Sequence, residues 1–195
     1  MNTLIDSAIS MANDEYTTHE LNKEHGKGSW KHNDGWGIAY KNENNEWVIE
    51  KSHNNICTDT KINSLRGITT KHAIIHIRKK MGSEVAIENT HPFVVSEKKG
   101  KTHVFCHNGF IDEDIYFDPR FTLNGETDSE RLFYSLLSDR MASSSMTKAI
   151  RHNFTRYKKL TGTNIILSNN TETYVALREN SFPTYYQMQM AELDN

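Results

Sequence analysis

Four short segments place polar and charged side chains at the ends of expected strands. They are HNDGWG at residues 32–37, HIR at 76–78, CHNG at 106–109 and TDSE at 127–130. Their imidazole, carboxamide, guanidinium and carboxylate groups supply the donors and acceptors with which proteins bind polar ligands. The pair Asn108-Gly109 allows two interpretations. It is either a tight hairpin turn or a piece of backbone placed at a strand end for chemistry.

Each segment also has a purely structural explanation. Asn-Gly between alternating apolar residues is the strongest short hairpin signal, because both residues accept positive φ at low cost. Asp34-Gly35 reads as a turn, with Trp36 as a core aromatic. Arg78 reads as a surface charge at a strand end. Taken one at a time, these structural interpretations are preferred over function.

The fourth segment predicts the start of a helix. Thr127 and Glu130 have the spacing of a capping box, and Asp128 is an acid that the helix dipole favours. The apolar residues Leu132, Phe133, Leu136 and Leu137 would then face inward. A second helix is expected over residues 146–159.

The remaining elements follow from hydrophobic periodicity. A short amphipathic helix is expected over residues 3–12, capped by Asn2 or Thr3, followed by a loop over 13–31 with Gly26 and Gly28 as breakers. Strands are expected at 36–40, 47–50, 72–78, 103–106, 164–168 and 173–177, with 72–78 buried on both faces. Strands in hairpins with helices between them favour an α+β fold with largely antiparallel sheets.

Composition limits the class of protein. The 195 residues suit one domain, and the net charge of -2 gives no basic field for nucleic acid. No membrane span or secretion signal is evident, so a soluble, cytoplasmic protein is expected. Cys57 and Cys106 lie far apart without metal-ligand spacing, which fits a reducing compartment.

In their order, five segments resemble one family. HNDGWGIAY, HIR, NTHPF (residues 89–93), HNG and TDSE are similar to the pattern of the class II glutamine amidotransferase domain, an N-terminal-nucleophile hydrolase, and especially its small stand-alone branch. The resemblance runs from about His32 to Tyr186. It implies an αββα sandwich of two mainly antiparallel sheets and a reaction that needs no metal or organic cofactor.

The resemblance also implies roles for individual residues. Arg78 would bind the α-carboxylate of glutamine through a planar fork, and Asp128 would bind the α-ammonium group. The Asn108 side chain and the Gly109 N–H would stabilise the oxyanion of the tetrahedral intermediate. Trp36 and His91 would shape the pocket walls. In this context Asn108-Gly109 is interpreted as an oxyanion hole, with the hairpin turn as the alternative.

The sequence departs from the family at the nucleophile. The family uses a cysteine at its mature N-terminus, whereas this chain begins Met-Asn-Thr, and neither Cys57 nor Cys106 is a convincing substitute. Residues 1–195 are therefore expected to form a single domain that lacks the first strand and a C-terminal part. Either the natural protein starts earlier, or this is a shortened relative that has lost catalysis. The first explanation is preferred.

The leading functional prediction is hydrolysis of glutamine or another γ-glutamyl amide through an acyl-enzyme. Lys80 and Met81 stand where the family has small residues, which favours a substrate other than free glutamine. A separate ammonia-accepting protein would be the partner. The alternative is a catalytically inactive module that binds glutamine or a γ-glutamyl ligand. A metal hydrolase is disfavoured, because the histidines lack zinc-ligand spacing.

Overall fold

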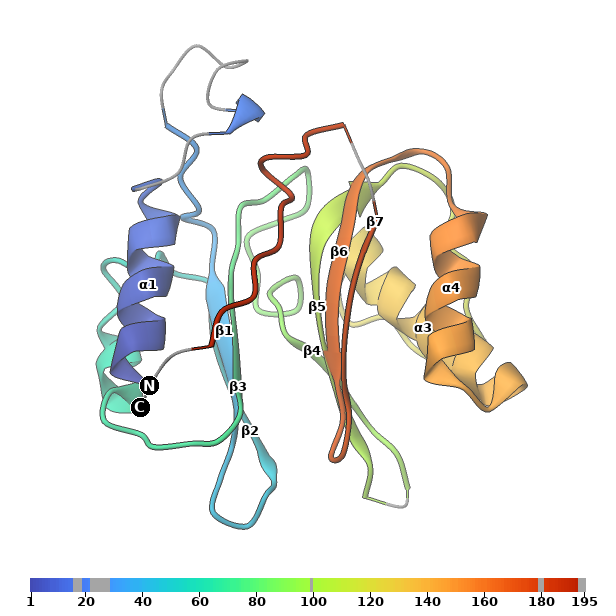
Figure 1. Cartoon of the computed structure of the whole chain (residues 1–195), viewed down its shortest axis with the longest axis horizontal. Helices are drawn as coiled ribbons and strands as arrows, with labels where there is room; N and C mark the ends of the chain where they lie inside the picture. The colour runs from blue at the N-terminus through green and yellow to red at the C-terminus, as the bar shows by residue number, and fades with distance from the viewer. Residues whose placement is uncertain (16–18, 22–28, 99, 179–180, 193–195) are drawn as a thin grey trace.

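Two antiparallel sheets face each other, and each carries helices on its outer surface (Figure 1). The computed structural model describes residues 1–15, 19–21, 29–98, 100–178 and 181–192. The strands are β1 (Trp36–Lys41), β2 (Trp47–Ser52), β3 (Ala73–Ile77), β4 (Phe93–Ser96), β5 (Thr102–Ile111), β6 (Leu160–Ser168) and β7 (Thr173–Arg178). The helices are α1 (Asn2–Ala12), the short 3₁₀-helix η1 (Thr60–Leu65), α3 (Asp128–Ser143) and α4 (Met146–Arg156). The expected α+β architecture of antiparallel sheets is confirmed.

The first sheet has the strand order β2-β1-β3 and is covered on its outer face by α1 and η1. Ile5 and Ala8 of α1 pack against Trp36 and Ile38 of β1. The helix prediction for residues 3–12 is therefore confirmed, but its expected cap is wrong. Met1 is the N-cap residue and no side chain caps the helix, because the Asn2 side chain instead accepts a hydrogen bond from the Gly67 amide.

The second sheet has the strand order β4-β5-β6-β7, with α3 and α4 against its outer face. Leu132, Phe133, Leu136 and Leu137 of α3 are buried as expected. The Thr127 hydroxyl accepts a hydrogen bond from the Glu130 amide, which confirms half of the capping box. The other half is wrong, because the Glu130 carboxylate accepts from the Asn124 and Gly125 amides instead.

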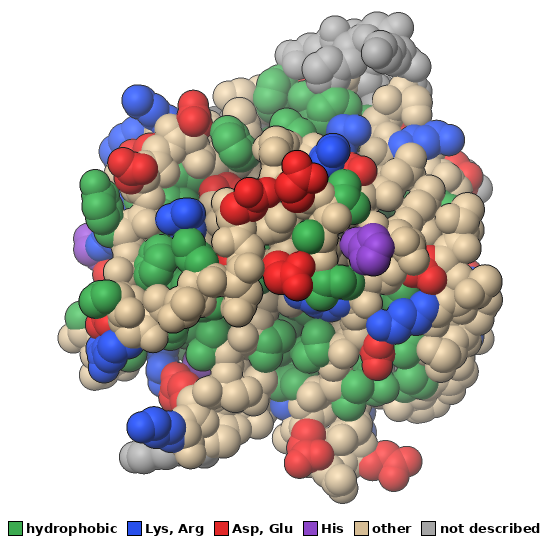
Figure 2. Space-filling model, turned by 180° about the vertical axis from the view of Figure 1, so that it is seen from behind, with side chains coloured by type: hydrophobic (Ala, Val, Ile, Leu, Met, Phe, Trp, Pro, Cys, Tyr) green, Lys and Arg blue, Asp and Glu red, His purple; other side chains and the backbone are tan. Residues whose placement is uncertain are grey.

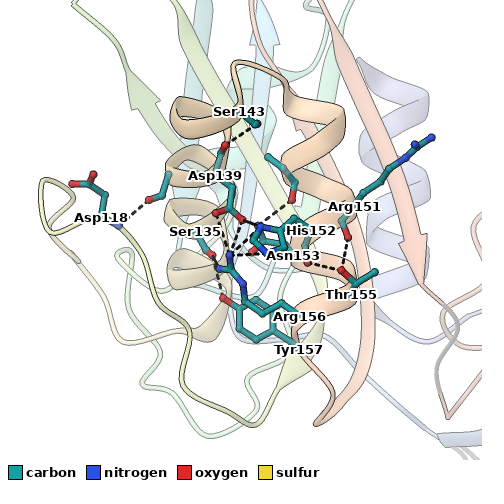
Figure 3. Close-up of polar contacts among 12 residues, drawn as sticks. Asp118, Ser135, Asp139, Ser143, Arg151, His152, Asn153, Thr155, Arg156 and Tyr157 are labelled. Atoms are coloured by element: carbon teal, nitrogen blue, oxygen red, sulfur yellow. Dashed lines mark hydrogen bonds and ion pairs between the residues drawn. The ribbon is translucent and has the colours of Figure 1, made fainter.

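Helices α3 and α4 are also joined by a polar cluster on their facing surfaces (Figure 3). The Asp139 carboxylate accepts from Asn153 Nδ2 at 2.7 Å and from Arg156 Nη2 at 3.2 Å, and it lies 3.0 Å from His152 Nδ1. Nearby, the hydroxyl groups of Ser135 and Tyr157 form a hydrogen bond of 3.1 Å. These contacts hold the two helices together as one layer.

Three strand predictions need correction. β3 is an edge strand rather than a strand buried on both faces, and of its residues only Ile74 is fully buried. The short strand β4 was not expected. β5 continues through Asn108 and Gly109, which pair with Asn164 and Thr163 of β6, so the hairpin interpretation of Asn108-Gly109 is excluded. The predicted hairpins over β1–β2 and β6–β7 are confirmed.

The inner faces of the sheets meet in a small apolar core. Ala39 of β1 and Ile74 of β3 pack against Val104 and Cys106 of β5, with Ile166 of β6 at the margin. On the opposite side of β5, Phe105 and His107 point toward α3. This alternation leaves Asn108 on the inner face, at the end of the core, where polar side chains gather.

The surface carries both signs of charge. Figure 2 shows acidic and basic side chains interspersed over one face, as the small net charge suggests. The loop predicted over residues 13–31, with Gly26 and Gly28, lies mostly outside the described residues. Among the residues that the structure describes, no helix is long and apolar enough to cross a membrane.

Candidate active site

A cavity of about 480 Å³ lies where the ends of β3 and β5 meet the start of α3. Arg78, His91, Asn108, Gly109 and Asp128 all line it. Up to 50 residues separate these positions along the chain, so only the packing of the two sheets and α3 brings them together. Five of the six residues predicted for the site therefore share one cavity.

Arg78 follows β3 directly and is 4% exposed. Its Nη1 donates to the Asp34 carbonyl at 3.1 Å, and its Nη2 donates to Ser83 Oγ at 2.7 Å and to the Glu84 carbonyl at 2.9 Å. These partners are uncharged oxygen atoms. They hold the guanidinium group in one orientation in the lining of the cavity, and the nearby carboxylates of Asp34 and Glu126 favour its charged form.

Asn108 and Gly109 lie near the end of β5 and not in a turn. A Cβ atom added to Gly109 would lie 2.0 Å from the Gly162 carbonyl oxygen of the neighbouring strand. No real side chain tolerates that distance, and the obstacle is backbone that cannot rotate away. Glycine is required here by the close approach of β6.

Asp128 is the first residue of α3, and its side chain is turned toward β5. Its Oδ2 accepts a hydrogen bond from the Ile111 amide at 2.9 Å and lies 4.0 Å from His107 Nδ1. The side chain keeps 19% of its surface exposed. One carboxylate oxygen thus connects the start of the helix to the end of β5.

Four histidines also line the cavity, namely His32, His76, His91 and His107. Burial lowers the pKa of His76 to about 3 and that of His32 to about 4, and it also lowers the pKa values of His91 and His107. All four rings are neutral near pH 7. The ring centroids of His76 and His91 lie 4.1 Å apart, so the two rings are neighbours in the lining of the cavity.

Sequence reasoning anticipated only part of this histidine wall. His107 was expected to be a hydrogen-bonded structural residue, and its Nδ1 lies 2.9 Å from Ser129 Oγ. His91 was expected in the wall, whereas His32 and His76 were not assigned to it. The abundance of histidine and the position of His76 on the same strand as Arg78 were the signals available.

The remaining predicted residue, Trp36, lies outside this cavity. It is fully buried in the core beneath α1, and its Nε1 donates to Asp59 at 3.1 Å. Neither cysteine lines the cavity. Cys106 is buried between the sheets, which raises the pKa of its thiol, and Cys57 is half-buried beside α1. In the described part of the chain, no three histidine, cysteine or acidic residues are grouped so that they could hold a metal ion.

Comparison with known sequences gives a consistent result. The family model described as "Glutamine amidotransferases class-II" matches residues 2–184. The protein YafJ of Escherichia coli K12 is 33% identical over 116 residues, which cover 58% of this chain and 45% of YafJ. The protein MJ1515 of Methanocaldococcus jannaschii is 35% identical over 127 residues, covering 61% and 35% of the two chains. The chain thus spans less than half the length of these curated relatives.

Solved structures support the same fold. A predicted glutamine amidotransferase from Pseudomonas aeruginosa superposes with a TM-score of 0.54 at 26% identity, covering 74% of this chain and 60% of that one. Glutamine phosphoribosylpyrophosphate amidotransferase from B. subtilis has a TM-score of 0.54 at 19% identity, over 74% of this chain and 31% of that one. The second likeness concerns the fold alone.

Proposed function

Because the chain belongs to the class II glutamine amidotransferases, we propose that its cavity binds glutamine or a related γ-glutamyl amide for hydrolysis of the side-chain amide. One observation carries the proposal. Arg78 after β3, Asn108 and Gly109 of β5, and Asp128 of α3 come from three separate parts of the chain and nevertheless line one cavity. A cation, an anion and two amide groups in one site match the carboxylate, the ammonium and the carbonyl of the amino acid.

Charge complementarity determines how the ligand would sit. The Arg78 guanidinium, oriented by neutral oxygens, receives the α-carboxylate, and the partly exposed Asp128 carboxylate receives the α-ammonium group. A γ-glutamyl amide held at both groups extends its side chain along the cavity toward Asn108. Because the histidines are neutral, the cationic side chains that line the cavity are Arg78, Lys79 and Lys80.

The chemistry proposed for this site is acyl transfer. A thiolate attacks the amide carbon, and the Asn108 side chain with the Gly109 N–H stabilises the resulting oxyanion. The C–N bond then breaks, ammonia or an amine leaves with the proton taken from the thiol, and water hydrolyses the thioester to give a γ-carboxylate. Loss of one oxyanion donor typically lowers the rate by about 10²–10³.

Cys57 and Cys106 do not reach the cavity, so we propose that the thiol belongs to an N-terminal cysteine ahead of Met1. Its free α-amino group would serve as the general base. The intact mass and N-terminal residue of the protein from its native source test this part. A heavier chain beginning with cysteine supports it, whereas a chain that begins at Met1 contradicts it.

Ligand binding can be tested without the nucleophile. Isothermal titration of residues 1–195 with L-glutamine should show binding that Arg78→Lys and Asp128→Asn each weaken at least about tenfold. Arg120→Lys is the matched control, because Arg120 is an exposed arginine that pairs with Asp118 on the surface. Unchanged affinity in Arg78→Lys, or no binding by the parent chain, would contradict the proposal.

A second candidate is a non-catalytic module that binds glutamine or a γ-glutamyl ligand. The location of both cysteines outside the cavity favours it. The two candidates differ in one measurement on the protein from its native source. Ammonia release from glutamine supports the hydrolase, and tight binding without release supports the module.

A further inference from the structure

The NTHPF segment at residues 89–93 contributes a second residue to the cavity besides His91. Asn89 is 3% exposed and lines the cavity. Burying a carboxamide costs free energy unless its donors and its acceptor have hydrogen-bond partners. The partners of Asn89 therefore indicate why an asparagine occupies this position.

The Asn89 carboxamide joins two loops. Its Oδ1 accepts from the Glu126 amide at 2.9 Å, and its Nδ2 donates to the Glu84 carbonyl at 3.1 Å and to Glu126 Oε1 at 3.4 Å. A backbone N–H can only donate and a backbone carbonyl can only accept, so the orientation of the carboxamide is fixed. Both amide hydrogens have protein acceptors. Asn89 therefore acts on the two loops rather than on a ligand.

The first of these loops orients Arg78. The Glu84 carbonyl accepts from Arg78 Nη2 at 2.9 Å as well as from Asn89 Nδ2. The Glu84 amide donates to Glu126 Oε1 at 2.6 Å. The backbone of Glu84 is thus hydrogen-bonded both to the guanidinium group and to the pair formed by Asn89 and Glu126.

The second loop leads into α3. Glu126 stands two residues before Asp128, and Thr127 between them caps the helix. The Asp128 carboxylate is held in turn by the hydrogen bond that it accepts from the Ile111 amide. A continuous series of hydrogen bonds therefore runs from the Arg78 guanidinium to the start of α3.

Gly125 shows how closely the two loops approach each other. A Cβ atom added to Gly125 would lie 2.3 Å from Asn89 Oδ1 and 2.9 Å from the Glu88 carbonyl oxygen. The second obstacle is backbone, which cannot rotate away as a side chain can. Any larger residue at position 125 would therefore push the two loops apart.

An α-amino acid presents its two charged groups at a fixed separation. The ammonium nitrogen and the carboxylate carbon are bonded to the same α-carbon and lie about 2.5 Å apart. A site that binds both groups needs its cation and its anion at a matching distance, because charge-assisted hydrogen bonds weaken when their geometry is distorted. The contacts of Asn89 and Glu126 connect the cation of this cavity to its anion.

We propose that Asn89 and Glu126 are positioning residues, which hold Arg78 and Asp128 at the separation that suits an α-amino acid. This inference rests on the proposed function, in which Arg78 binds the α-carboxylate and Asp128 binds the α-ammonium group. The site then selects γ-glutamyl amides that carry both charged groups over carboxamides that carry only one. Loss of the connection should weaken the binding of glutamine more than that of an analogue without the ammonium group.

Isothermal titration of residues 1–195 with two ligands tests the inference. L-Glutamine carries both charged groups, and 5-amino-5-oxopentanoate lacks only the α-ammonium group. The parent chain should bind L-glutamine at least about tenfold more tightly, the value of one charge-assisted hydrogen bond. Glu126→Ala should reduce this preference to less than about threefold. Glu126 is exposed, so its truncation leaves the core intact.

Three further variants separate positioning from charge and from folding. Glu126→Gln keeps the acceptor oxygen but loses the charge that favours the cationic form of Arg78, so it should retain the preference. Asn89→Ala removes the centre of the connection and should lose the preference as Glu126→Ala does. Glu88→Ala is the matched control, because it removes an exposed carboxylate from the same loop. Thermal unfolding checks that each chain is folded.

The ligand preference of Glu126→Ala decides the inference. If the parent chain binds L-glutamine and Glu126→Ala keeps the tenfold preference, the inference is overturned and the proposed function stands. An equal loss of preference in Glu126→Gln also overturns it, because charge would then be the cause. Absence of L-glutamine binding by the parent chain overturns the proposed function, and the inference with it.

Discussion

The helix-covered side of the second sheet and the open edge, where the described strands of the two sheets end at β3 and β7, are built from similar apolar strands. They differ in what covers them. Phe105 and Ile165 of the second sheet are fully buried beneath α3 and α4. At the open edge, Val175 and Leu177 remain more than half exposed. Apolar side chains on a strand stabilise the fold only where a second layer excludes water from them.

The difference also separates stability from function. The covered side holds the large aromatic and aliphatic side chains, whereas the cavity, with the buried Arg78 guanidinium and the neutral histidines, lies beside the end of β3. Substitutions on the covered side should therefore change the free energy of unfolding at neutral pH, and those around the cavity should change ligand binding or the pH dependence of stability.

The largest effect is expected for Phe133→Ala on the covered side. Phe133 is fully buried and stacks on Phe105 with 5.0 Å between ring centroids. Its loss leaves a cavity between α3 and β5 and should lower the free energy of unfolding by about 3–5 kcal/mol. Urea denaturation measures this change. A decrease in the free energy of unfolding of less than about 1 kcal/mol would contradict the view that the covered side stabilises the fold.

Lowering the pH should reduce the stability of the folded chain through His76 of β3. The pKa of His76 is about 3 in the folded chain, compared with about 6.5 when unfolded. Between these values the unfolded chain binds the proton and the folded chain does not, so stability falls as the pH drops from about 6.5 toward 3. The slope for one such group approaches about 1.4 kcal/mol per pH unit.

Urea midpoints at pH 7, 5.5 and 4.5 measure this acid effect. His76→Gln should flatten the dependence, and His53→Gln is the control, because His53 is an exposed histidine outside the cavity. Equal pH dependence in the parent chain and His76→Gln would contradict the prediction.

A smaller effect is expected at the junction of the two regions. Thr127 caps α3 by accepting from the Glu130 amide at 3.2 Å. Thr127→Ala should lower the free energy of unfolding by about 1 kcal/mol, and Thr127→Ser should restore most of it. Thermal unfolding compares the three chains. Equal midpoints for the alanine and serine variants would exclude capping as the cause.

The smallest effect is expected at Leu177. In residues 1–195, Leu177→Ser should change the free energy of unfolding by less than about 0.5 kcal/mol, because the side chain is 58% exposed. Leu167→Ser, on the same sheet but fully buried, is the matched comparison and should lower stability by several-fold more. Equal losses in the two variants would mean that the β7 face is already covered.

Asn108-Gly109 and Asn169-Asn170 show why local signals alone were insufficient. Both pairs stand between apolar runs, but only the second pair makes the turn between two strands. Residues 160–168 return along β5 far enough to pair with Asn108 and Gly109, which keeps that pair extended. A turn signal gives way where a partner strand supplies backbone hydrogen bonds on both sides of it.

Local chemistry was sufficient for other elements. The period of apolar residues and the Thr127 cap predicted α3 correctly, and alternating residues around polar turns predicted the β1–β2 and β6–β7 hairpins. The strand β4 was missed because His91-Pro92 precedes it and charged residues follow it, and its pairing with β5 is what makes it a strand. The position of β3 at the edge of its sheet could not be predicted either, since an edge is defined by the lack of a partner strand, here among the described residues.

By itself the sequence determined the class of elements, the family and the identity of the polar residues, because periodicity, caps and ordered segments are local properties. Only the tertiary structure decided that Arg78, Asn108, Gly109 and Asp128 share a cavity, that four histidines are neutral in its walls, and that β3 and β7 form an open edge. Burial, pKa shifts and strand edges depend on neighbours that are distant in the chain.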